Sequence, residues 1–496
     1  MIYRSTRDNN ASVKSARAIV EGISPEGGLY LPRSLPRLDA DRLSTLAQMD
    51  YKGRAFDILS DFLDDFDREA LSRGIASAYG KGFASEKITP IVKLCPGSYM
   101  LELWHGPTCA FKDLALQLLP HLVAYAAEKE AGGKTVNILV ATSGDTGKAA
   151  LEGFKDTPGT NILVFYPRDG VSRIQELQMT TQQGGNVQVC GVRGNFDDTQ
   201  AALKKIFTSA EIKTRLEANN AVFSSANSIN WGRLAPQIVY YVSAYCELVN
   251  NGELAPGEKL NITVPTGNFG NILAAYYAGK MGLPVGKLIC ASNRNNVLAD
   301  FIDTGVYDRR REFYATSSPS MDILVSSNLE RLLHALTGED DQAVAGFMSA
   351  LGHEGVYSLP AHAFGELKAN FYGGFCGEAE TAATIKDTFQ NLGYLCDPHT
   401  AVALKVYRDY VEKTGDNTKT LIASTASPFK FAGSVLAALT GQPSAEDEFT
   451  QLRKLANITG ASPPTQITEL ESLPVRFEQT CEKDGLEQVV VQALGL

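Results

Sequence analysis

TVNILVAT (135–142), NILVFY (161–166) and NVQVCG (186–191) are three short β-branched runs, and a helical pattern separates each run from the next. The same alternation continues through NITVP (261–265), KLICAS (287–292) and TLIAST (420–425). Strands that alternate with helices are typical of βαβ units, in which neighbouring strands run parallel. The sequence therefore predicts an α/β fold with parallel sheets flanked by helices.

The first ninety or so residues have a different pattern. They are charged and helical after the turn SPEGGLYLPRSLP (24–36), in which Gly and Pro indicate loop structure. We therefore expect an amino-terminal helical lobe at 1–92, a smaller α/β domain at 93–230 and a larger α/β domain at 231–496. The Ser-rich piece TSSPSMD (316–322) is interpreted as a simple connector.

Composition narrows the functional classes. The chain has 496 residues and a net charge of −10, which argues against binding to a nucleic-acid backbone. We find no run of roughly 20 apolar residues that would span a membrane. The first residues, MIYRSTRDNN, are too charged for a secretory signal, so a cytoplasmic location is expected. The cysteines and histidines lack metal-site spacing, so we expect no metal.

Two glycine-rich turns each follow a strand and precede a helix. GNFGN (267–271) would let backbone N–H groups converge on an anion at the helix N-terminus, although an ordinary turn is the alternative. SGDTGKAA (143–150) fails the P-loop pattern because Thr142 and Ala149 replace its Gly and its Ser or Thr. Its Ser143 and Thr146 hydroxyls suit a carboxylate, with a plain helix cap as the alternative.

Lys112 stands out in HGPTCAFKDLALQ (105–117), where we expect it one turn into an apolar helix. Most lysines at such a position reach solvent. In a desolvated pocket beside Phe111, the pKa of its ammonium would fall and the amine could form a Schiff base.

A Schiff-base lysine, a phosphate cradle and a carboxylate-binding turn are together the parts that hold pyridoxal phosphate and an amino acid. The set resembles the tryptophan-synthase-β group of pyridoxal enzymes, known as fold type II, and within it the threonine synthases. The matching motifs follow the family's order: YRSTR (3–7), PEGGLYLP (25–32), HGPTCAFKD (105–113), ATSGDTGKAA (141–150), YPRDGVSRIQELQMT (166–180), NSINWGRLAPQIVYY (227–241), VPTGNFGNILAAYYA (264–278), DPHTAVA (397–403) and STASPFKFAGS (424–434).

The resemblance implies an activity and a cofactor. A threonine synthase uses pyridoxal 5'-phosphate to convert O-phospho-L-homoserine and water into L-threonine and phosphate, the last step of threonine biosynthesis. Lys112 would hold the cofactor as a Schiff base and then move protons at Cα and Cβ of the substrate. The cofactor phosphate would lie on Gly267, Asn268, Phe269, Gly270 and Asn271. The Thr425 hydroxyl would face the pyridine nitrogen.

The resemblance also suggests where the substrate binds. Ser143, Gly144, Asp145 and Thr146 match the loop that meets its α-carboxylate, and we expect Asp145 to point away and cap the following helix. Candidates for the substrate phosphate are Arg233, Lys148 and Asn230, with Arg233 favoured because a guanidinium can bind phosphate through two donors. Arg168 and Arg173 are further possibilities. Whether the protein is a monomer or a homodimer is left open.

Two other functions remain as alternatives. One is a different pyridoxal lyase of the same fold, such as a threonine dehydratase or a cysteine-synthase-like enzyme, which needs no site for a substrate phosphate. The other is a non-catalytic relative that binds a phosphorylated metabolite or a partner. The amino-terminal lobe with GGLYLP (27–32) argues against the first alternative, and Lys112 together with both glycine-rich turns argues against the second.

Overall fold

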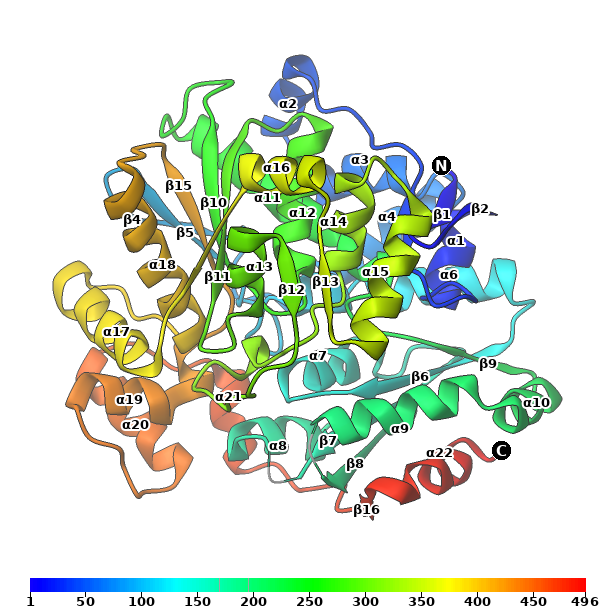
Figure 1. The fold of residues 1–496 in the computed structure, drawn as a ribbon. Helices are drawn as coiled ribbons and strands as arrows, with labels where there is room; N and C mark the ends of the chain where they lie inside the picture. Colours follow the sequence, from blue (N-terminus) through cyan, green and yellow to red (C-terminus); the bar gives the residue numbers. More distant parts are fainter. Residues whose placement is uncertain (169, 195) are drawn as a thin grey trace.

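The computed structural model describes residues 1–168, 170–194 and 196–496, and its main parts are two large β-sheets and an amino-terminal lobe (Figure 1). The larger sheet has six strands in the order β14-β11-β10-β15-β5-β4. All its strands are parallel to their neighbours except β4, which is antiparallel to β5. The strand bounds are β4 Ile91–Cys95, β5 Ser98–Glu102, β10 Leu260–Pro265, β11 Val285–Ser292, β14 Phe371–Phe375 and β15 Thr420–Ser424.

Helices cover both faces of this larger sheet. The adjacent glycines 373 and 374 of β14 face opposite sides, and an added Cβ would meet α13 (Val297–Thr304) at Gly373 and α18 (Pro398–Thr414) at Gly374. Every residue of β10 and β15 is buried, as expected for central strands of a covered parallel sheet. Other helices around it are α11 Trp231–Asn250, α12 Gly270–Met281, α16 Ala361–Asn370, α17 Glu378–Leu392, α19 Ala432–Thr440 and α20 Glu448–Thr459.

The smaller sheet is entirely parallel, with five strands in the order β16-β8-β7-β6-β9. Its strands are β6 Thr135–Ala141, β7 Thr160–Pro167, β8 Val187–Arg193, β9 Ala221–Ser224 and β16 Thr480–Glu482. Its helices are α6 Leu119–Glu130, α7 Asp145–Phe154, α8 Arg173–Thr180, α9 Phe196–Thr208, α10 Ala210–Ala218 and α22 Leu486–Leu494. The predicted α/β class with two parallel sheets flanked by helices is therefore confirmed.

At two places, strands belong to a different sheet from the one that the expected domain ranges would give them. Strands β4 and β5 belong to the larger sheet, although most of their residues fall in the range expected for the smaller domain. Strand β16, near the carboxyl end, returns to pair with β8 of the smaller sheet. The division into three domains stays a prediction.

The amino-terminal lobe contains a small sheet in addition to the expected helices. It consists of antiparallel strands β1 (Tyr3–Ser5), β2 (Asp8–Val13) and β3 (Tyr30–Pro32), with helices α1 Ser15–Glu21, α2 Ala40–Ala47, α3 Tyr51–Phe62 and α4 Arg68–Ala78. Between α13 and α16 lie β12 Val306–Asp308, α14 Leu329–Leu336, α15 Asp341–His353 and β13 Val356–Ser358.

Trp231 joins the lobe to the larger sheet. Its buried ring makes edge-to-face contacts with Tyr3 and Phe62 of the lobe at centroid distances of 5.6 and 5.5 Å, and with Tyr277 of α12 at 5.9 Å. Aromatic pairs in this geometry stabilise a core beyond their buried area. The lobe is thus anchored on α11, the helix that also bears Arg233.

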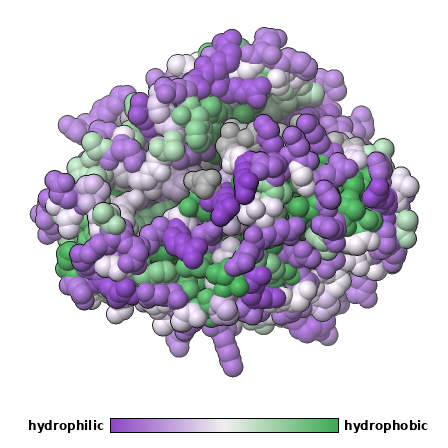
Figure 2. All heavy atoms as spheres, turned by 90° about the horizontal axis from the view of Figure 1, so that it is seen from below, coloured by the Kyte–Doolittle hydropathy of each residue, from purple (hydrophilic) through white to green (hydrophobic). Residues whose placement is uncertain are grey.

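The surface is largely polar. The face in Figure 2 is mostly hydrophilic, with smaller apolar areas between the polar side chains. Within the described residues, no helix is long and apolar enough to cross a membrane.

Candidate active site

Lys112 is the residue directly before the short helix α5 (Asp113–Leu116). The expectation that it lies one turn inside a helix is wrong, because the preceding turn extends to Cys109, which has a left-handed φ of 59°. Thr108 closes the turn: its N–H donates to Oδ2 of Asp113 at 2.8 Å and its hydroxyl to Oδ1 at 2.6 Å. This turn directs the Lys112 side chain into a cavity.

The Lys112 amine is buried among charged groups. Its side chain is 9% exposed, and its Nζ lies 3.5 Å from Oδ2 of Asp145 and donates to the Ser320 hydroxyl at 3.3 Å. Burial lowers the pKa of Lys112, Asp145 opposes this effect, and Lys430 and Arg233 lower the pKa further. A buried amine with a lowered pKa is suited to act as a nucleophile or as a base.

The first turn of α7 is capped by Thr142 and not by Asp145. The Thr142 hydroxyl accepts hydrogen bonds from the N–H groups of Gly144 at 2.9 Å and Gly147 at 2.8 Å. Asp145 makes no capping bond, so the expectation that it caps the helix is wrong.

Asp145 points into the cavity instead, where it is paired with two lysines. Its Oδ1 lies 2.8 Å from the Lys430 Nζ and accepts from Gln175 Nε2 at 3.1 Å, while Oδ2 faces Lys112. Burial alone would raise the pKa of Asp145, but Lys430 and Lys112 outweigh it and hold the pKa well below its usual range. Asp145 is therefore an ionised carboxylate inside the site.

The turn at residues 267–271 leads from β10 into α12. Phe269, the residue before the helix, has a left-handed φ of 63°. In the described part of the chain, none of the five backbone N–H groups of this turn donates a hydrogen bond. Gly267 packs against the loop that bears Ser320. A helix N-terminus with unpaired N–H groups is a site for an anion such as phosphate.

Two buried donors on the cavity wall also lack an acceptor within the described residues. One is Nδ2 of Asn271, whose Oδ1 accepts from the hydroxyls of Tyr240, at 2.7 Å, and Tyr241. The other is Nε of Arg233, whose Nη1 donates to the Ala226 carbonyl at 2.9 Å. Burial lowers the pKa of Arg233 to about 10. Because an unpaired buried donor is costly, both favour a ligand with acceptor oxygens.

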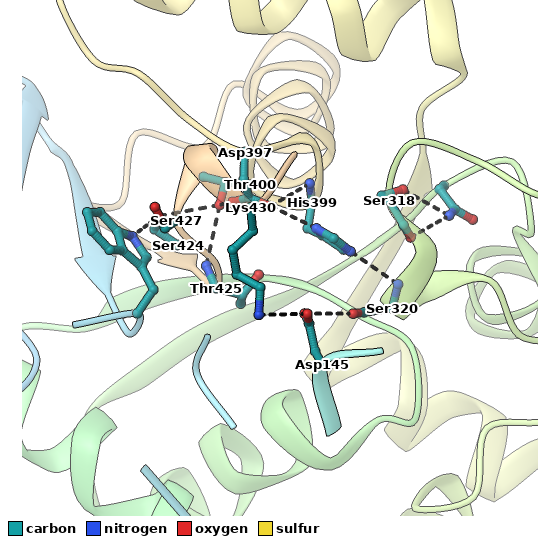
Figure 3. A network of polar contacts seen from close by, with 12 residues as sticks. Asp145, Ser318, Ser320, Asp397, His399, Thr400, Ser424, Thr425, Ser427 and Lys430 are labelled. Carbon is teal, nitrogen blue, oxygen red and sulfur yellow. Dashed lines mark hydrogen bonds and ion pairs between the residues drawn. The ribbon is translucent and has the colours of Figure 1, made fainter. Parts of the chain in front are cut away.

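The loop at 316–322, which the sequence suggested was a simple connector, completes the site. The backbone N–H of Ser320 donates to Nε2 of His399 at 3.2 Å, and the Nδ1 of His399 lies 2.8 Å from Asp397 Oδ1 (Figure 3). The Ser320 hydroxyl donates to Asp145 at 3.4 Å. The segment 316–322 is therefore not a simple connector, because it brings a hydroxyl to the two central charged groups.

Lys430 is the main residue that sequence reasoning missed. Its side chain is fully buried, and its Nζ bonds Asp145 and the carbonyl of Thr108, the latter at 2.9 Å. It lies in SPFKF (427–431), the segment that follows β15. A lysine among apolar neighbours, one short turn after Thr425, was the feature that could have found it.

A single cavity of about 790 Å³ brings most of the predicted site residues together. It lies where the loops after β6 and β10 meet, at the carboxyl ends of parallel strands, which is the usual place for ligands in α/β proteins. The predicted residues that line it are Lys112, Ser143, Asp145, Thr146, Arg233, Gly267, Asn268, Phe269, Gly270, Asn271 and Thr425.

The remaining candidates do not line this cavity. Lys148 pairs with Glu152 at 3.0 Å, and Asn230 donates to the backbone carbonyls of Ile19 and Ser225, both at 2.9 Å, at the start of α11. Gly144, Arg168 and Arg173 also lie outside it. Among the candidates for a substrate phosphate, the structure thus brings only Arg233 to the cavity.

Three family models together match nearly the whole chain. One described as "Threonine synthase N terminus" matches residues 2–79, one described as "Pyridoxal-phosphate dependent enzyme" matches 85–425, and one described as "Threonine synthase, C-terminal" matches 400–490. The chain belongs to the threonine synthase family. It is a pyridoxal-phosphate-dependent enzyme of that family, as the motifs predicted.

Curated relatives of this threonine synthase family member fall into two groups. Threonine synthase-like 1 of Homo sapiens is 41% identical over 96% of this chain, and the chain spans 64% of the length of that relative. Threonine synthase of Methylobacillus glycogenes is 37% identical over 99% of this chain and 100% of its own length. Threonine synthase of Pseudomonas aeruginosa is 38% identical over 89% of this chain and 91% of its own length.

Solved threonine synthases share the fold. A pyridoxal-phosphate-bound threonine synthase from Brucella melitensis is 35% identical, with a TM-score of 0.88 over 99% of both chains. The threonine synthase from yeast is 32% identical, with a TM-score of 0.88 over 100% of this chain and 99% of that one.

The cavity fits the cofactor of the threonine synthase family. The unpaired N–H groups of residues 267–271 suit its phosphate, and Lys112 is buried in the same cavity. Thr425, at the end of β15, lines the wall and is held by the Phe111 N–H, which donates to its carbonyl at 2.8 Å. The donor set therefore agrees with pyridoxal phosphate, and the expectation of this cofactor is confirmed.

Proposed function

We propose that this protein is a threonine synthase (EC 4.2.3.1), a carbon–oxygen lyase that converts O-phospho-L-homoserine and water into L-threonine and phosphate. The observation that supports this most is one cavity holding a buried amine and two separate places for anions. The amine is Lys112, and the anion sites are the N-termini of α7 and α12. A cofactor phosphate, a substrate carboxylate and a substrate phosphate all require such donors.

Lys112 and residues 267–271 would hold the cofactor. Lys112 Nζ is the group that would bind it covalently, because burial keeps the pKa of this amine low. The N–H groups of the turn would bind its phosphate, with the buried amide of Asn271 as a further donor. The Thr425 hydroxyl would face the ring nitrogen; since a hydroxyl is neutral, it would not force a proton onto that nitrogen as a carboxylate would.

When bound, pyridoxal phosphate supplies an electron-accepting ring that stabilises negative charge developing on the substrate carbons. Lys112, once released by the incoming amino group, would remove the Cα proton and then move protons at Cβ. Its neighbour Asp145 stays ionised and would stabilise Lys112 whenever the lysine holds a proton.

The substrate would be fixed at both ends. Ser143 and Thr146 line the cavity at the start of α7, where hydroxyls and N–H groups suit the α-carboxylate. Arg233 lines it from α11 with an unpaired Nε, which suits the phosphate that leaves from Cγ. Lys148 and Asn230, both occupied by other partners, become weaker candidates for this role.

The test is product analysis with purified protein and O-phospho-L-homoserine. Equal amounts of inorganic phosphate and L-threonine are expected. Phosphate release without threonine would contradict the addition of water, and release of neither product would reject the proposal.

Several other expectations stay predictions. These are a cytoplasmic location, the absence of a metal, the absence of nucleic-acid binding, and the small-molecule substrate itself. The choice between monomer and homodimer stays open.

A further inference from the structure

Asp145 lies between two buried lysines that reach it from different elements. Lys430 Nζ lies 2.8 Å from Oδ1, and Lys112 Nζ lies 3.5 Å from Oδ2 (Figure 3 shows the contact with Lys430). The exposed fractions of the Lys430 and Asp145 side chains are 0% and 2%. The shorter ion pair is thus made with the lysine that does not line the cavity.

The arrangement is fixed from several sides. Lys430, in the short helix η2 (Pro428–Phe431), also donates to the carbonyl of Thr108, in the same turn that positions Lys112. Gln175 donates to Oδ1 of Asp145, so the carboxylate has little freedom to turn. In such a buried setting, charge interactions are far stronger than in water.

The Asp145 carboxylate therefore interacts with two cations at once. Without Lys430, Lys112 would be the one ion-pair partner left to the carboxylate among the described residues, and the protonated form of Lys112 would be favoured. Arg233 also acts on Lys112 as a cation, and His399 also acts on Asp145. Neither makes an ion pair with Asp145 that would replace Lys430.

We propose that Lys430 is a positioning residue that holds Asp145 in an ion pair and thereby leaves the Lys112 amine free to bind the cofactor and to move protons. The proposal rests on the proposed role of Lys112. It also explains how a carboxylate can stand in a loop expected to bind an anionic substrate, because the Asp145–Lys430 pair has no net charge.

The test measures the ionisation of the Lys112 amine itself. Full-length protein, with the cofactor removed by hydroxylamine, is treated at a series of pH values with trace acetic anhydride, which acetylates only unprotonated amines. Mass spectrometry of the peptide containing Lys112 then gives the midpoint pH of its reactivity. This readout requires neither cofactor nor substrate, so it is independent of whether O-phospho-L-homoserine is converted.

The variants have opposite expected effects. Lys430→Met should raise the midpoint by about one pH unit or more, which leaves about tenfold less free amine at a given pH. Asp145→Asn should lower it. The double variant should return it to the wild-type value or slightly below, because both charges are gone. Lys419→Met removes a half-buried lysine paired with Glu258 far from the cavity, and should leave the midpoint unchanged.

If Lys430 had only a structural role, Lys430→Met would lower the stability of the protein without changing the pH midpoint of Lys112 acetylation. An unchanged midpoint in Lys430→Met, or a double variant no different from that single variant, would overturn the proposal. Removing one member of a buried pair can prevent folding. If Lys430→Met does not fold, the Asp145→Asn variant and the double variant are compared instead. The proposal would be overturned if the pH midpoint of Lys112 acetylation equals the wild-type value in both. A lower midpoint in Asp145→Asn than in the double variant would support it.

Discussion

Gly267 packs so closely against Ser320 that a Cβ added at position 267 would lie 2.5 Å from the Ser320 carbonyl oxygen. Real Cβ atoms do not approach a carbonyl oxygen so closely. Gly267 thus joins the turn proposed to bind the cofactor phosphate to the loop that brings the Ser320 hydroxyl to Lys112 and Asp145.

Gly267→Ala is therefore expected to weaken cofactor binding. The added methyl must displace either the 267–271 turn or the 316–322 loop, because backbone is involved on both sides. Equilibrium dialysis should show a dissociation constant for pyridoxal phosphate at least tenfold above wild type. Gly365→Ala, in α16, is the matched control, since the added Cβ would meet no described atom within 4 Å other than its chain neighbours and the backbone of its own helix. Equal affinity in the two variants would contradict the role given to this contact.

His399→Leu is expected to loosen the 316–322 loop. The substitution removes the acceptor of the Ser320 N–H and the partner of Asp397, and an unpaired buried polar group costs about 1–3 kcal/mol. Limited proteolysis should cut within the loop sooner than in wild type, and the melting temperature should fall. His353→Leu, at an exposed site on α15, should leave the cleavage pattern as it is. Unchanged loop cleavage in His399→Leu would show that Ser320 is held by other contacts.

Asp113 should make stability depend on pH in a specific direction. Burial raises its pKa from the ordinary value of 3.8 to about 6, while hydrogen bonds from Thr108 oppose the shift. The folded protein then binds a proton that the unfolded chain releases, so the Asp113 contribution to the free energy of unfolding falls as pH rises from about 4 to about 6. Comparing wild type with Asp113→Asn by urea unfolding isolates this slope. If the free energy of unfolding has the same dependence on pH in wild type and in Asp113→Asn across that range, the raised pKa of Asp113 would be contradicted.

Asn271→Leu tests the unpaired amide in the cavity. The change removes Nδ2 from the proposed phosphate site and leaves the Tyr241 hydroxyl without its acceptor, whereas the Tyr240 hydroxyl can still donate to Gln237 Oε1 at 3.1 Å. Cofactor affinity should fall several-fold, and stability should fall by about 1–3 kcal/mol. Asn271→Asp retains the acceptor but replaces the donor by a negative charge. It should therefore bind the cofactor more weakly than Asn271→Leu while losing less stability, and the reverse order would argue against a phosphate at this position.

Much of the fold could be predicted because the central strands are long and continuously apolar. Runs such as NILVFY (161–166) and NITVP (261–265) indicate parallel strands without further information. The lobe's small sheet could not be predicted in this way, because Tyr3–Ser5 and Tyr30–Pro32 are too short to show alternation. Strand β16 is equally short, and only tertiary pairing with β8 defines it.

In the candidate site, too, the sequence predicted what depends on local patterns and missed what depends on tertiary contacts. The two glycine-rich turns and Lys112 were found because each lies in a local pattern of strand, turn and helix. The orientation of Asp145 was not, because it depends on Lys430, which arrives from a distant part of the chain. Ser320 likewise reaches the site through His399, a contact that no local pattern contains.

The most direct test of the whole account is borohydride reduction of the purified holoenzyme, with phosphate and threonine assayed in wild type and in Lys112→Ala. Borohydride is expected to fix the cofactor on the peptide containing Lys112, and both products should form only when Lys112 is present. Cofactor fixed on another lysine, or equal product formation by Lys112→Ala, would contradict the account.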